Sequence, residues 1–142
     1  IFINGLQWAF RFDIYNANYI SFSFVSTILY MFTQTLIMFY LIGAGKKVKE
    51  LIIEYKLDTG IYDEVIKIKR ELFPGLTLNI LFIGTAFVLG GGVQTKVLSK
   101  YWHYAIFVIG FLHYIKVILL QHSALIKNAD ILSRIGKELE SR

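Results

Sequence analysis

The chain has 142 residues, of which 56% are hydrophobic, 18% are charged and none is cysteine. A soluble domain usually has about 45–50% apolar and about 25% charged residues, so this composition favours lipid as the solvent. Without cysteine, the chain supplies no disulfide, no thiolate nucleophile and no cysteine-ligated zinc or iron–sulfur cluster. The net charge of +5 is not gathered into a nucleic-acid-binding motif, so we expect no nucleic acid partner.

Three apolar runs follow a mixed N-terminal segment. Residues 1–18 combine aromatic and charged side chains, which predicts an interfacial segment rather than a span. Residues 19–42 and 76–93 contain no charge, and we expect a third span over residues 104–122. A helix needs about 20 apolar residues to cross a bilayer core of about 30 Å, and lipid leaves backbone groups no other partner. The sequence therefore predicts an all-α membrane protein with three transmembrane helices.

The segments outside the spans are charged and amphipathic. Residues 46–73 hold seven basic and six acidic side chains, with apolar residues at helical spacing and a break at Asp58-Thr59-Gly60. This pattern predicts an amphipathic helical hairpin outside the membrane. We expect the next helix to begin at Pro74, because the first turn does not need the missing N–H. Residues 94–103 form a predicted outer loop, and residues 123–142 a helical tail.

The distribution of basic residues predicts an orientation for this single membrane domain, residues 1–142. The hairpin and the tail hold seven and four Lys or Arg residues, whereas the N-terminal segment and the outer loop hold one and two. Three spans place the hairpin and tail on the same side. The positive-inside rule then puts them in the cytoplasm and the N-terminus outside. We expect the cell inner membrane, with anionic lipids against the basic residues and bound lipid around the spans.

Polar residues within the spans are the first candidates for function. Gln34 and Asn79 are expected to form interhelical hydrogen bonds, the alternative being that they line a path for a polar solute. The first span has a polar face spaced four, three and four residues apart: Ser23, Thr27, Tyr30 and Gln34. Lys116 lies near the middle of the third span, four residues before its apolar run ends, and no acid occurs in any apolar run. We therefore expect its ammonium to reach the interface by snorkelling.

The histidines His103, His113 and His122 suggest haem. They lie on one predicted helix at spacings of ten and nine residues, about 15 and 14 Å along its axis. One chain cannot close a bis-histidine site from them. His113 or His103 is a candidate for one ligand of a b-type haem shared with another subunit. The competing interpretation is that His103 and His122 are interfacial residues and His113 is a packing residue.

No catalytic or metal-binding constellation is evident, so we expect no enzyme activity from this chain by itself and no metal. The leading hypothesis is a small accessory or scaffold subunit that packs against other membrane protein subunits in a larger complex. The alternative is a redox or ion-handling subunit that contributes His113 and Lys116 to a shared haem, quinone or proton site. A third hypothesis is a self-associating oligomer with a pore on its symmetry axis.

Overall fold

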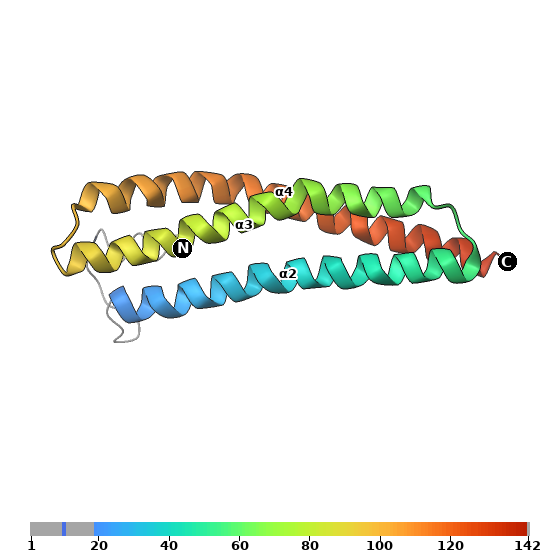
Figure 1. The fold of residues 1–142 in the computed structure, drawn as a ribbon, viewed down its shortest axis with the longest axis horizontal. Helices are drawn as coiled ribbons and strands as arrows, with labels where there is room; N and C mark the ends of the chain where they lie inside the picture. Colours follow the sequence, from blue (N-terminus) through green and yellow to red (C-terminus); the bar gives the residue numbers. More distant parts are fainter. Residues whose placement is uncertain (1–9, 11–18, 142) are drawn as a thin grey trace. The chain divides into compact units, whose positions relative to one another are not determined.

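Long helices make up nearly all of the part of the chain that the structure describes. The structure is a computed structural model that describes residue 10 and residues 19–141. Its helices are α2 (Tyr19–Tyr55), α3 (Gly60–Gln94) and α4 (Lys100–Glu140), and residues 19–141 contain no strand (Figure 1). This confirms the predicted all-α class. The interfacial segment predicted for residues 1–18 lies outside the described residues, apart from Phe10.

Each helix is much longer than a bilayer core. With 37, 35 and 41 residues, the helices extend over about 55, 52 and 61 Å, against about 30 Å of hydrocarbon. Each contains a stretch long and apolar enough to cross a membrane, which confirms the prediction of three spanning helices. The surplus length carries the charged residues. The predicted tail is therefore the continuation of α4.

The amphipathic hairpin is likewise built from the ends of spanning helices. α2 continues through Gly43-Ala44-Gly45 into the charged segment, and α3 already begins at Gly60. The expectation that a helix begins at Pro74 is wrong, because this residue lies inside α3. A proline there leaves one backbone carbonyl without its usual N–H partner. Leu72 and Leu76 on either side are fully buried, and this burial offsets the lost hydrogen bond.

The turn after α2 and the end of α3 use the same cap. Lys56 has a left-handed backbone with φ 53°, and the Leu57 N–H donates to the Ile52 carbonyl at 3.1 Å. At the end of α3, Lys96 has φ 59°, and the Val97 N–H donates to the Gly92 carbonyl at 3.0 Å. This is the Schellman arrangement, in which glycine is the preferred left-handed residue. Lysine at both positions therefore carries backbone strain.

Replacing Lys56 with glycine should stabilise the protein, because glycine adopts the left-handed conformation without a Cβ clash. We expect a gain of about 1 kcal/mol in the free energy of unfolding in detergent micelles. The matched control is Lys67→Gly, at an exposed position in the interior of α3, which should lose about 1 kcal/mol. Loss of stability in both variants would contradict the strained cap.

The described chain divides into two compact units, and each helix contributes to both. Unit 1 comprises Ile1–Gln34 and Leu78–Ile115, and unit 2 comprises Thr35–Thr77 and Lys116–Arg142. Unit 2 has an apolar core drawn from all three helices. Its fully buried large apolar side chains are Leu41, Val48, Val65, Leu72, Leu76, Val117, Ile131 and Ile135. Charged side chains cover much of its outside, as in a water-soluble bundle.

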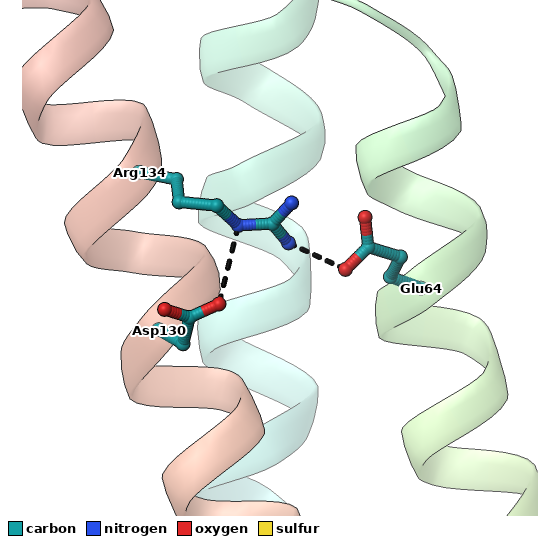
Figure 2. Close-up of polar contacts among 3 residues, drawn as sticks. All are labelled: Glu64, Asp130 and Arg134. Carbon is teal, nitrogen blue, oxygen red and sulfur yellow. Dashed lines mark hydrogen bonds and ion pairs between the residues drawn. The ribbon is translucent and has the colours of Figure 1, made fainter.

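Ion pairs link α3 and α4 in unit 2 at a constant interval. Arg134 pairs with Glu64 across the helices and with Asp130 on its own helix at 3.3 Å (Figure 2). Lys127 pairs with Glu71 at 3.7 Å. The partners move seven residues forward on α3 and seven back on α4. An antiparallel pair of helices with a heptad repeat has this spacing.

Buried residues recur at the same interval on every helix. On α2 they are Thr27, Gln34, Leu41 and Val48; on α3, Val65, Leu72, Asn79 and Ala86; on α4, His103, Gly110, Val117, Ala124 and Ile131. A repeat of 3.5 residues per turn is the signature of coiled-coil packing. We refer to these positions as the heptad seam.

Candidate functional site

Unit 1 has a polar interior and an apolar exterior. Its buried residues include polar side chains from each of the three helices: Ser23, Thr27, Gln34, Asn79 and His103. Its exposed side chains include large hydrophobic ones on all three helices, such as Phe32, Leu81 and Leu112. This inverts the pattern of a water-soluble protein. In lipid, by contrast, polar and small residues face neighbouring helices while apolar residues face the hydrocarbon.

Asn79 is the centre of the polar interior. Its side chain is 0% exposed. The amide nitrogen donates to the Gly110 carbonyl at 3.0 Å and lies 3.2 Å from Nδ1 of His113. The Tyr30 hydroxyl donates to the amide oxygen. One α3 side chain therefore binds both α2 and α4, and we refer to Tyr30, Asn79, Gly110 and His113 as the Asn79 cluster.

The hydrogen bonds indicate which ring nitrogen of His113 is the acceptor. The Asn79 amide nitrogen must face the Gly110 carbonyl, because two oxygens could not share a hydrogen bond there. Its second hydrogen then points to Nδ1 of His113, which accepts it. In a neutral imidazole the proton is consequently on Nε2. With the Tyr30 hydroxyl on its oxygen, the Asn79 amide thus uses its oxygen and both N–H hydrogens in hydrogen bonds within the chain.

Aromatic rings and a glycine close the cluster. The Tyr30 ring meets Tyr114 edge-on at 5.8 Å between centroids, and the Phe82 ring meets His113 at 5.5 Å. Gly110 is buried, and a Cβ at this position would lie 3.1 Å from the Cβ of Phe82. The absence of a side chain lets α3 and α4 approach closely. This approach brings the Gly110 carbonyl within reach of Asn79.

His103 forms a second link on the same seam. It is buried, and its Nδ1 lies 2.9 Å from the Ala86 carbonyl. Ala86 is seven residues after Asn79, and His103 is seven before Gly110. The side chain that we predicted as a haem ligand or interfacial residue therefore packs against α3, with Phe107 stacked 6.4 Å from its ring.

The remaining candidates lie outside the Asn79 cluster. Gln34 is buried in unit 1, and its side-chain oxygen has no hydrogen-bond partner among the described residues. Lys116 belongs to unit 2, where it is exposed, as the snorkelling prediction requires. Of the predicted site residues, the structure thus brings together Asn79 and His113. Their functional roles stay predictions.

Sequence reasoning missed Gly110, whose contribution is a backbone carbonyl. The seven-residue interval would have identified it, since it continues from His103 into the apolar seam residue Val117. The cluster contains no carboxylate, and within residues 19–141 no three His, Asp or Glu side chains gather as metal ligands would. Its chemistry is hydrogen bonding between neutral groups.

Comparison of the chain with protein-family models, curated proteins and solved structures finds no match. The class of the protein therefore follows from its own features. Three long apolar helices, with polar residues turned inward, are consistent with a helical multi-pass membrane protein.

Replacing Asn79 with leucine should destabilise the bundle without a large change in volume. The substitution leaves the Tyr30 hydroxyl and His113 Nδ1 without their partner, so we expect a loss of about 2 kcal/mol in the free energy of unfolding in mixed micelles. Thr77→Val, at an exposed position of α3, is the control and should change it by less than about 0.5 kcal/mol. Equal losses in the two variants would show that the Asn79 cluster does not hold the helices together.

Proposed function

We propose that this chain is a small accessory or scaffold subunit of a larger membrane protein complex. The observation that carries the proposal is the use of intramembrane polar groups by the chain itself. Asn79 forms its hydrogen bonds with Tyr30, Gly110 and His113, and His103 contacts the Ala86 carbonyl. Groups engaged in this way hold helices in register. They are poorly placed to handle a solute.

The charged end of the helices supports a docking role. In unit 2, α2, α3 and α4 share an apolar core, and two acids of α3 pair with two bases of α4 along the surface. A rigid bundle of this kind presents a fixed pattern of charge, which suits recognition of a protein surface. The exterior of unit 1 is apolar and is available to lipid or to the helices of neighbouring subunits.

The proposed location is the inner (cytoplasmic) membrane, with the hairpin and C-terminus in the cytoplasm and the N-terminus outside. The excess of Lys and Arg on the hairpin and tail supports this orientation, eleven residues against three on the other side. In this orientation the charged part of unit 2 lies in the cytoplasm.

The alternative proposal gives His113 and Lys116 a redox or proton-handling role, with a shared b-type haem or quinone. A haem iron binds an unprotonated imidazole nitrogen. Nδ1 of His113 is occupied by Asn79, and its proton is on Nε2. Ligation by either nitrogen would thus require rearrangement of the Asn79 cluster, which favours the scaffold proposal.

Purification of the tagged full chain from its native membrane in mild detergent tests the proposal. We expect other membrane proteins to co-purify at a fixed stoichiometry. A monodisperse monomer with no bound protein, or an assembly that contains this chain alone, would contradict the accessory role. An absorption spectrum of the same sample separates the alternatives. We expect the spectrum to contain no Soret band that depends on His113. A Soret band that is present in the wild type and absent in His113→Gln would favour the haem proposal.

A further inference from the structure

The two sides of α3 differ in how their charges are satisfied in unit 2. On the side of α4, Glu64 and Glu71 pair with Arg134 and Lys127. On the side of α2, Lys69 of α3 has no carboxylate within ion-pairing distance among the described residues. The α2–α3 side therefore has a cationic group that nothing in the described chain neutralises.

Lys69 is held in place by the absence of a side chain on α2. Its ammonium lies directly against Gly45, where a Cβ would collide with Nζ. The side chain is half-buried, and Gly45 itself is buried. Burial lowers the pKa of Lys69, because the ammonium has lost part of its hydration. A bound anion would restore the lost stabilisation.

Further positive charge directly follows this position on α2. Lys46 and Lys47 directly follow Gly45 and share one acid, Glu50, at 3.8 and 4.0 Å. Three lysines against one glutamate leave a net charge of +2. The weak, shared pairing leaves both surface ammonium groups able to turn toward an anion.

The depth of the lysines matches the edge of a membrane. The exposed apolar residues Phe39 and Ile42 of α2 precede Lys46 by seven and four residues. Four residues of helix rise by about 6 Å, which places these lysines just beyond the hydrocarbon, where lipid phosphates lie.

We propose that Lys69, which lies against Gly45, forms with the neighbouring Lys46 and Lys47 a binding site for the phosphate of an anionic lipid headgroup. The lipid chains would extend along the apolar surface near Phe39 and Ile42. The site rests on the membrane insertion of the chain but does not depend on the partner complex. The positions of Lys46 and Lys47 alone would also fit lysine side chains that reach the interface independently of one another, without a shared site. Such independent snorkelling does not explain the Lys69 ammonium, which has no acid partner in the described part of the chain and packs against the buried Gly45.

The test uses the purified full chain in dodecyl maltoside micelles at low salt. Its melting temperature is followed during titration with dioctanoyl phosphatidylglycerol, dioctanoyl phosphatidylcholine or inorganic phosphate, because a ligand that binds the folded state raises the temperature. Lys69→Gln and Lys46→Gln remove charges from the site. Lys67→Gln removes the same charge from an exposed α3 position two residues before Lys69, and is the matched control.

We expect phosphatidylglycerol to stabilise the wild type and Lys67→Gln at similar concentrations, and Lys69→Gln to need about fivefold more. Lys46→Gln, a surface change that should not impair folding, is expected to weaken binding in the same direction. Equal weakening by Lys67→Gln and Lys69→Gln would overturn the site in favour of diffuse attraction. Equal stabilisation by phosphatidylcholine, or stabilisation by inorganic phosphate without phosphatidylglycerol, would also overturn it. Co-purification of partners is a separate readout, so failure here leaves the scaffold proposal standing.

Discussion

Hydrocarbon offers no hydrogen-bond partner, so every polar group carried into a bilayer must find one in protein. In unit 1, Asn79 meets this constraint, because it joins α2, α3 and α4 by hydrogen bonds in a fully buried position. Unit 2 follows the opposite rule, with apolar side chains inside and charges outside. On α2 the heptad seam changes from Gln34 to Leu41, and on α3 from Asn79 to Leu72. Along the same helices, the seam positions thus change from polar to apolar.

A polar residue on a coiled-coil seam selects one register at some cost in stability. Asn79 can perform this role because Gly110 allows the two backbones to approach and offers its carbonyl. A slip of α4 by one turn would move the Gly110 carbonyl away from the amide and break this hydrogen bond. The cluster therefore serves to fix the fold, and this is the physical basis for preferring a scaffold over a redox carrier. In the scaffold proposal the surfaces make the contacts with partners, and the ion pairing on these surfaces differs from one side of α3 to the other.

Composition and periodicity predicted three spans, the turn near Asp58 and the helical tail, because long uncharged runs and amphipathic spacing have few alternatives. The continuity of α3 could not be predicted from Pro74, since burial of Leu72 and Leu76 overrides the local preference. The left-handed conformation of Lys56 could not be predicted either, because the sequence sign of such a helix cap is normally a glycine at this position. The partners of Asn79 could not be predicted, because the residues of the heptad seam in this part of the chain are polar or small. A search for periodic apolar residues does not detect them.

The most direct test of the account asks whether the apolar surface of unit 1 lies in lipid. Because the chain contains no native cysteine, single cysteines can be introduced and labelled. Phe32 and Ile53 both lie on α2 and are 59% and 68% exposed. Single cysteines at these positions, in intact membranes made permeable to the reagent, are treated with a water-soluble maleimide. We expect the cysteine at 53 to react rapidly and that at 32 to react only after detergent is added, because thiolate and reagent both need water. Equal reaction rates at the two positions before detergent would contradict a lipid-covered unit 1.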